Sequence, residues 1–147
     1  MAAASSDEPV DVADDDDNDD AAEAAAAALM ASVQRGFAAA KAAGVPAATR
    51  LMKELRAVCA GDSGCEIRLL NDSLQQWEIS LFEWAFDEAS AIHKDLKQLS
   101  EEADDLIPLQ LRVAFPDDFP FAPPLVFCSS PTLASEFIFD GALCMEM

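Results

Sequence analysis

The sequence predicts an α+β domain in which a helix precedes a meander of four antiparallel strands. Apolar residues recur with helical spacing over residues 47–60. They then alternate with polar residues over 77–81 and over 107–115, which is the period of a half-buried strand. Segments rich in turn-forming residues separate these elements.

Composition places this domain in the later part of the chain. The 147 residues are enough for one domain and a tail. The formal net charge is −19, and the first 34 residues carry ten of the 28 acidic residues but no lysine or arginine. Affinity for nucleic acid comes from lysine and arginine that displace counterions, so we expect no nucleic-acid partner.

The first 45 residues are predicted to form a tail and a linker. Residues 1–20 are acidic, and we expect them to be disordered, with binding to a basic protein as the alternative. The alanine-rich segment 21–45 favours a helix, and Asp20 and Glu23 have capping-box spacing. Its apolar stripe is thin, and Gly36 weakens its middle. We therefore expect a loosely attached linker helix rather than a partner-docking helix.

The domain itself begins with the most regular helix of the chain. Pro46 is a first-turn proline for the helix over 47–60. The glycines at 61 and 64 end this helix. Its apolar face consists of Leu51, Leu55 and Val58.

The remaining elements follow in the order of a meander with one inserted helix. A first strand over 66–70 leads through a turn to the second strand over 77–81. Residues 87–101 return to helical spacing. The third strand covers 107–115, and the fourth covers 125–128 because the preceding prolines cannot donate to a sheet ladder.

The chain shows neither a secretory leader nor an apolar segment of the ~20 residues that span a membrane. We therefore expect a cytoplasmic or nuclear protein with no membrane partner, whose four cysteines are reduced. The spacing of Cys59 and Cys65 is not that of a zinc site, and His93 is the only histidine. We interpret Cys59 and Cys128 as buried structural residues and Cys65 as exposed.

Two motifs in the last third indicate a function. The turn Phe119-Pro120-Phe121-Ala122-Pro123-Pro124 follows the third strand, and twenty residues later comes Gly141-Ala142-Leu143-Cys144-Met145-Glu146. Together they resemble the core of ubiquitin-conjugating enzymes, in which the cysteine carries ubiquitin as a thioester. Residues 70–77 and the helical insert around 91–96 are similar to the Q branch of that family. We assign residues 46–147 to a partial ubiquitin-conjugating domain.

The resemblance implies a role for each matching residue. Cys144 would accept ubiquitin from an activating enzyme and pass it to a lysine, usually with a ligase. Phe121 and Pro123 match the loop that contacts ligases, while Arg50 and Lys53 match the helix face that meets the activating enzyme and ligases. The resemblance implies no bound cofactor, since ATP is used upstream by the activating enzyme.

The chemistry around Cys144 is less complete than in typical family members. Asp140 and Glu146 could polarise an incoming lysine, or they could belong to a solvated acidic loop. Negative neighbours disfavour a thiolate. Ala134-Ser135-Glu136 occupies the places of the family's His-Pro-Asn motif, and an ionised Glu136 cannot stabilise an oxyanion. Ser135 or a backbone N–H remain as candidate donors.

The family continues with helices beyond the cysteine, whereas this sequence stops at Met147. We therefore expect a domain truncated after its cysteine, with uncovered apolar surface over the strands at 77–81 and 107–115. Two alternatives to an enzyme follow. One is an inactive adaptor or fragment that keeps the Phe121 loop and only binds partners. The other is an acidic-tail interaction protein in which Cys144 is incidental.

Overall fold

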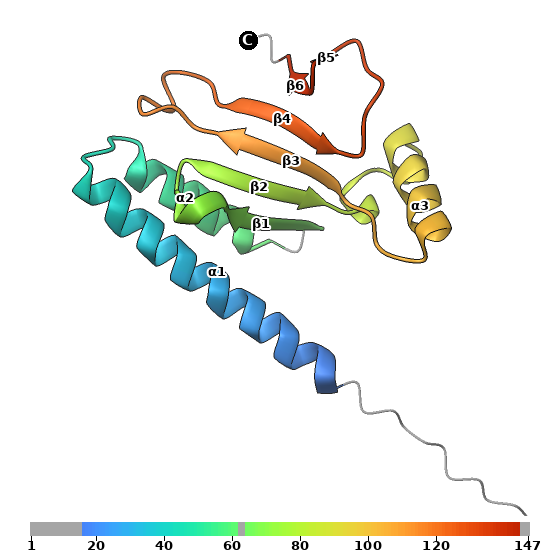
Figure 1. The fold of residues 1–147 in the computed structure, drawn as a ribbon, viewed down its shortest axis with the longest axis horizontal. Helices are drawn as coiled ribbons and strands as arrows, with labels where there is room; N and C mark the ends of the chain where they lie inside the picture. Colours follow the sequence, from blue (N-terminus) through green and yellow to red (C-terminus); the bar gives the residue numbers. More distant parts are fainter. Residues whose placement is uncertain (1–15, 62–63, 145–147) are drawn as a thin grey trace, which may run out of the picture.

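The fold is an antiparallel sheet with helices on one face and along one edge (Figure 1). A computed structural model describes residues 16–61 and 64–144. The elements in chain order are α1 (Asp16–Ala42), α2 (Ala48–Cys59), β1 (Cys65–Leu69), the 3-10 turn η1 (Leu70–Asp72), β2 (Gln76–Leu81), the 3-10 turn η2 (Glu83–Ala85), α3 (Ala91–Ala103), β3 (Leu109–Ala114), β4 (Leu125–Ser130), β5 (Ile138–Phe139) and β6 (Ala142–Leu143).

The sheet confirms the predicted meander and extends it. Strands β1 to β4 pair antiparallel with their sequence neighbours, as expected. The prediction of four strands is incomplete, because the order is β1-β2-β3-β4-β6-β5. The chain reverses at Asp140 and Gly141, whose φ values of 50° and 81° lie in the left-handed region. This turn folds β5 and β6 into a hairpin against the outer side of β4.

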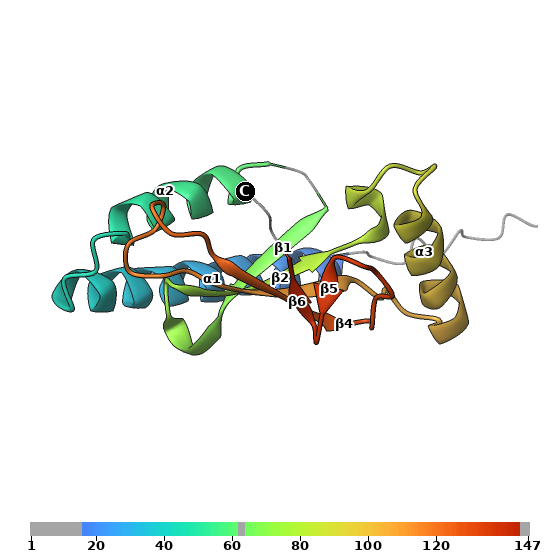
Figure 2. The same ribbon diagram turned by 90° about the horizontal axis from the view of Figure 1, so that it is seen from above.

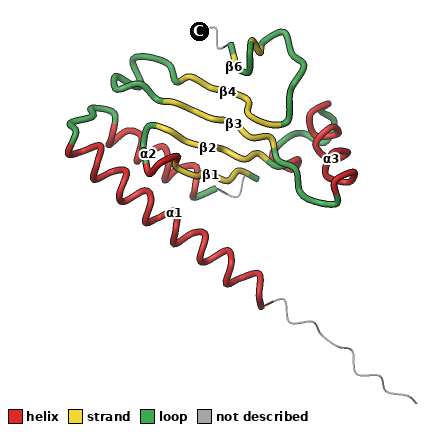
Figure 3. The backbone as a smooth tube through the Cα atoms, in the orientation of Figure 1, coloured by secondary structure: helices red, strands yellow, loops and turns green. Residues whose placement is uncertain are grey.

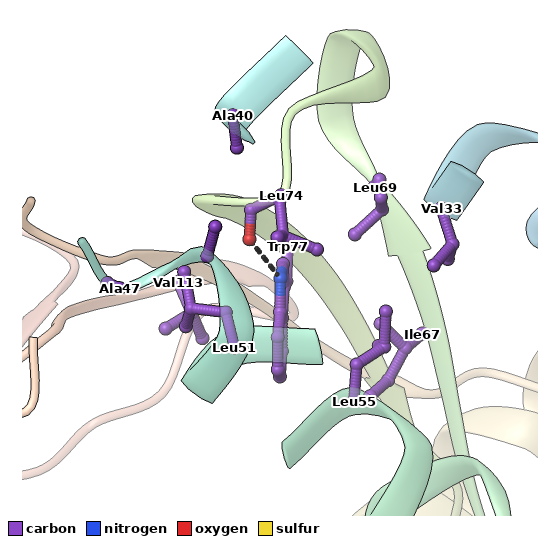
Figure 4. Packing of buried hydrophobic residues seen from close by; sticks show 11 residues of the cluster. Val33, Ala40, Ala47, Leu51, Leu55, Ile67, Leu69, Leu74, Trp77 and Val113 are labelled. Carbon is purple, nitrogen blue, oxygen red and sulfur yellow. Dashed lines mark hydrogen bonds between the residues drawn. The ribbon is translucent and has the colours of Figure 1, made fainter. Parts of the chain in front are cut away.

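The main core lies between α2 and one face of the sheet, which Figure 2 shows from above. Leu69, Trp77 and Val113 lie directly opposite one another on neighbouring strands, and all three are buried. Leu51 and Leu55 of α2 are almost fully buried in the same cluster (Figure 4). The indole Nε1 of Trp77 donates to the Leu74 carbonyl at 2.7 Å, which satisfies the polar atom of a buried ring.

Helix α1 is part of this core, so the expectation of a loosely attached linker helix is wrong. It covers Asp16–Ala42 rather than 21–45. Val33 and Ala40 on this helix are buried in the core cluster, and Leu29 and Phe37 pack against it. The N-terminal part of the helix extends away from the sheet (Figure 1). Residues 1–15, which carry most of the predicted disordered tail, lie outside the described residues.

A polar contact fixes α1 to the turn η1. Ser32 Oγ donates to Asp72 Oδ1 at 2.6 Å, and Arg35 Nε donates to Asp72 Oδ2 at 2.9 Å. Gly36 lies where a Cβ atom would be 2.6 Å from the backbone oxygen of Asp72. The absence of a side chain at Gly36 therefore allows the helix and the turn to approach, and this glycine is not simply a weak point.

Helix α3 closes the other end of the sheet, opposite the β3–β4 loop (Figure 3). It begins four residues later than predicted because Ser90 caps it, its Oγ accepting from the His93 amide at 3.2 Å. The His93 ring lies 2.8 Å from the Glu83 carbonyl and ties α3 to η2. Leu96 and Leu109 are buried outside the main cluster. None of the helices in the described part has an apolar stretch that could cross a membrane.

Candidate active site

Cys144 follows β6 directly and is exposed. Its backbone N–H donates to the Phe137 carbonyl at 2.8 Å. The hairpin that carries it is attached to β4, because the Cys128 amide donates to the Gly141 carbonyl at 2.7 Å and Phe127 pairs with Ala142. The sheet therefore holds the backbone of Cys144 in place while leaving its thiol open to a large partner.

The two predicted acidic neighbours of Cys144 are not brought together with it. Asp140 is exposed and lies in the turn before β6, whereas Cys144 follows β6, so the two residues stand at opposite ends of this strand. The positive φ of Asp140 gives it a turn-forming role in the backbone. Glu146 lies outside the described residues.

The residues in the places of the His-Pro-Asn motif form a turn before β5. Ser135 Oγ accepts from the Phe137 amide at 3.2 Å, and the Ser135 carbonyl accepts from the Ile138 amide at 3.3 Å. Glu136 is exposed. Residues 131–134, which lead into this turn, line a cavity of about 410 Å³ with α3. The helical insert therefore borders the chain that approaches Cys144.

The predicted ligase loop presents one aromatic side chain to solvent. Phe121 is 91% exposed between β3 and β4, and Pro123 is exposed nearby. The base of the loop is anchored in the core, because the Phe119 ring packs edge-on against Phe115 and Phe115 packs against Trp77, with ring centroids 4.9 and 4.6 Å apart. The exposure of Phe121 therefore belongs to a fixed loop.

The structure brings this loop to the same end of the molecule as the start of α2 (Figure 1). Phe119 of the loop and Ala48 of α2 belong to one core cluster. On the outer surface of α2, Arg50 Nε pairs with Glu54 Oε1 at 2.7 Å, and Lys53 is exposed. The predicted partner-binding residues thus share one end of the sheet, while Cys144 follows the short hairpin on the side of β4.

The other three thiols differ from Cys144 in their surroundings. Burial raises the pKa of Cys59, Cys65 and Cys128, and for Cys65 the neighbouring Cys59 and Glu66 raise the pKa further. The burial predictions need correction, since Cys59 is exposed at the residue level and Cys65 and Cys128 are half-buried. Over residues 16–61 and 64–144, no cluster of three or more histidine, cysteine or acidic side chains could hold a metal ion.

Comparison with known proteins identifies relatives of one kind. The chain is 41% identical over 109 residues to the human and mouse proteins named ubiquitin-conjugating enzyme E2 Q1, which covers 70% of this chain and 25% of theirs. It is 34% identical over 98 residues to a human Q-like relative of these ubiquitin-conjugating enzymes, covering 65% of this chain and 56% of that one. The chain thus spans between a quarter and about half of these relatives. No protein-family model matches it.

A solved structure confirms the fold. Human ubiquitin-conjugating enzyme E2 G1 superimposes with a TM-score of 0.51 over 68% of this chain and 71% of that one. The sequence identity is 16%, so this similarity concerns the fold alone. The predicted α+β architecture of ubiquitin-conjugating enzymes is therefore present.

Proposed function

Because this chain is related in sequence to the Q-type ubiquitin-conjugating enzymes, has their fold and is by that resemblance a transferase, we propose that Cys144 carries ubiquitin as a thioester. In the proposed reaction Cys144 takes ubiquitin from an activating enzyme and passes it to a substrate lysine, usually with a ligase. The observation that supports this most is the exposed thiol at the motif position, on a backbone fixed by the Phe137 contact.

The first step is an exchange between two thioesters. The Cys144 thiolate attacks the carbonyl carbon of the thioester on the activating enzyme. A new C–S bond forms, the old C–S bond breaks, and the activating enzyme's cysteine leaves as a thiolate. One thioester replaces another, so the step is nearly balanced in free energy. A free cysteine titrates near ~8.5, and only its thiolate fraction reacts.

The surroundings of the four thiols favour Cys144 as the reacting group. Burial raises the pKa of Cys59, Cys65 and Cys128 and thereby lowers their thiolate fraction near neutral pH. Cys144 is exposed and follows a short strand at the far end of the sheet order from β1 and β2. A protein-sized thioester can reach such a position without displacing any part of the core.

The partner surfaces of the proposal lie at the end of the sheet that carries Phe121, Pro123, Arg50 and Lys53. We infer that this end docks the activating enzyme and ligases, since an exposed aromatic side chain on a fixed loop loses little conformational freedom on binding. The proposed reaction uses no cofactor bound to this chain. We place it in the cytoplasm or nucleus, where thiols stay reduced.

A charging assay tests the proposal. The full chain is incubated with ubiquitin-activating enzyme, ATP and ubiquitin and is analysed on non-reducing and reducing gels. We expect a thiol-sensitive adduct that becomes a thiol-resistant ester in Cys144→Ser. Cys59→Ser is the matched control, because Cys59 is the other exposed thiol and its replacement leaves the Cys144 adduct intact. A wild-type chain that unfolds cooperatively yet forms no adduct would contradict the proposal.

A further inference from the structure

We propose that the Ser135 hydroxyl donates a hydrogen bond to the oxyanion that forms when a lysine amine attacks the thioester on Cys144. This inference rests on the proposed function and names the donor that its second step requires. It depends on the placement of Ser135 and Cys144 around one residue of the hairpin, Phe137.

Phe137 and Cys144 are opposite each other in the hairpin. The register pairs Phe139 with Ala142 and Ile138 with Leu143, so the next pair in sequence is Phe137 with Cys144. The bond from the Cys144 amide to the Phe137 carbonyl, at 2.8 Å, shows that the pairing continues to this point. Residues in such a pair of antiparallel strands normally exchange two N–H···O bonds.

Ser135 takes the place of one partner in this pair. The Phe137 amide, which in a regular pair would donate to the Cys144 carbonyl, instead donates to Ser135 Oγ at 3.2 Å. The N–H and C=O groups of one strand residue face the same neighbouring strand, so Ser135 Oγ lies on the side of Phe137 that faces Cys144. The hydroxyl is therefore next to the chain that carries the thiol.

The hydroxyl is both fixed and available. Its oxygen accepts from Phe137, and the Ser135 carbonyl accepts from Ile138, so the turn holds it from two sides. A hydroxyl that accepts through its oxygen still has its hydrogen free to donate. Ser135 is also exposed, so a thioester carbonyl on Cys144 has access to it.

The acidic side chains near the hairpin cannot take this role. Glu136 and Asp140 only accept hydrogen bonds when they are ionised, and the sequence has no lysine, arginine or histidine after Arg112. A donor placed in advance is worth most where charge develops in the transition state. Ser135 supplies such a donor at a site whose other side chains are acceptors.

The step is a substitution at the thioester carbonyl carbon. The neutral lysine amine attacks, a C–N bond forms, and the carbonyl electron pair moves to oxygen, which Ser135 stabilises without transferring its proton. Collapse restores the C=O bond and breaks the C–S bond, with the Cys144 sulfur leaving as a thiolate. The amine proton passes to this thiolate through water, and the products are an amide and the free thiol.

The test measures discharge of the loaded chain to free lysine in a single turnover. Ser135→Asn and Ser135→Asp are matched, because both side chains can accept from the Phe137 amide but only asparagine can also donate. We expect the maximal discharge rate at saturating lysine to fall about 10²-fold in Ser135→Ala and Ser135→Asp. Ser135→Asn stays close to the wild type, and the lysine concentration at half-maximal rate changes little in every variant.

Thr132→Ala is the control for loss of a hydroxyl elsewhere in the same segment, and it discharges like the wild type. Equal rates for the aspartate and asparagine variants would overturn the inference, because the side chain would then act only as an acceptor within the turn. Failure of the wild type to load ubiquitin would instead overturn the proposed function. The loading gel and the discharge rate therefore separate the two failures.

Discussion

Asp72 shows how a single residue connects an N-terminal helix to the domain. Arg35 and Ser32 donate to its carboxylate, and these hydrogen bonds hold the pKa of Asp72 below its ordinary value. A lowered pKa means that the folded state prefers the ionised carboxylate. The contribution of Asp72 to stability is therefore fully present above the unfolded pKa of ~3.9, and it is lost as pH falls through the lower folded pKa.

We predict that Asp72→Asn lowers the urea midpoint of unfolding at pH 6 and that the difference from the wild type shrinks as pH falls below ~4. The change keeps the shape of the side chain but removes its charge. Unfolding curves between pH 6 and pH 3 measure this difference. Glu101→Gln, at an exposed carboxylate on α3, is the control and leaves the curve close to the wild type. A constant difference at all pH values would contradict the prediction.

Sequence motifs located Cys144 and the exposed Phe121, but not the contacts around them. The role of Asp140 depends on a backbone turn that separates it from Cys144 by the length of β6, and the contact of Ser135 depends on the register of the hairpin. Neither follows from the order of residue types along the chain. The side chain of Ser135 became a specific candidate only when its partner, Phe137, was known.

At the level of elements, the long strands and α2 could be predicted because each has several turns or alternations of apolar residues. Strands β5 and β6 have two residues each, which is too few to show alternation. The dipeptide Asp140-Gly141 between them is a strong hairpin pattern and could have indicated the reversal. Helix α1 was misjudged because alanine and glycine on its inner face allow close packing that a count of large apolar residues does not detect.

Gly36 tests whether α1 is held by that close packing. We predict that Gly36→Ala destabilises the domain by about 1–3 kcal/mol, because the new Cβ atom would meet the Asp72 oxygen at 2.6 Å and the Leu74 nitrogen at 3.2 Å. Both neighbours are backbone atoms, so the helix itself must shift. The steric cost opposes the gain of about 1 kcal/mol in helix propensity that alanine brings.

Urea unfolding followed by circular dichroism measures this effect. Gly61→Ala is the matched control, since its Cβ atom would meet only the Val58 oxygen at 3.8 Å, an ordinary contact. That change should be neutral or slightly stabilising. If Gly36→Ala were as stable as the wild type, α1 would not be packed as closely as the structure shows.

The exposed apolar surface of the whole molecule differs from the prediction. We expected it over β2 and β3, but Trp77, Leu109 and Val113 are buried there. The main reason is that α2 and the end of α1 cover part of this face. Among the described residues, large exposed apolar side chains gather instead on β4, β5 and the segments beside them, where Phe127, Phe137 and Phe139 are at least 40% exposed.

The molecule separates its partner end from its thiol. Phe121 and α2 lie at one end of the sheet, whereas Cys144 follows β6 beyond β4, and the loop that carries Phe121 is anchored by its own aromatic contacts. Removing an exposed side chain from a fixed loop does not disturb its base. Docking and thioester chemistry should therefore respond independently to mutation.

We predict that Phe121→Ala leaves the urea midpoint unchanged within about 0.5 kcal/mol, because the ring is 91% exposed. The same change should reduce the stimulation of discharge by a cognate ligase about tenfold or more, since truncation of an aromatic anchor typically costs at least 1–2 kcal/mol of binding. The unstimulated discharge rate stays the same. Leu106→Ala, at another large exposed apolar residue, is the control and keeps full stimulation. Parallel loss of stimulated and unstimulated discharge in Phe121→Ala would show that the loop and the thiol are coupled after all.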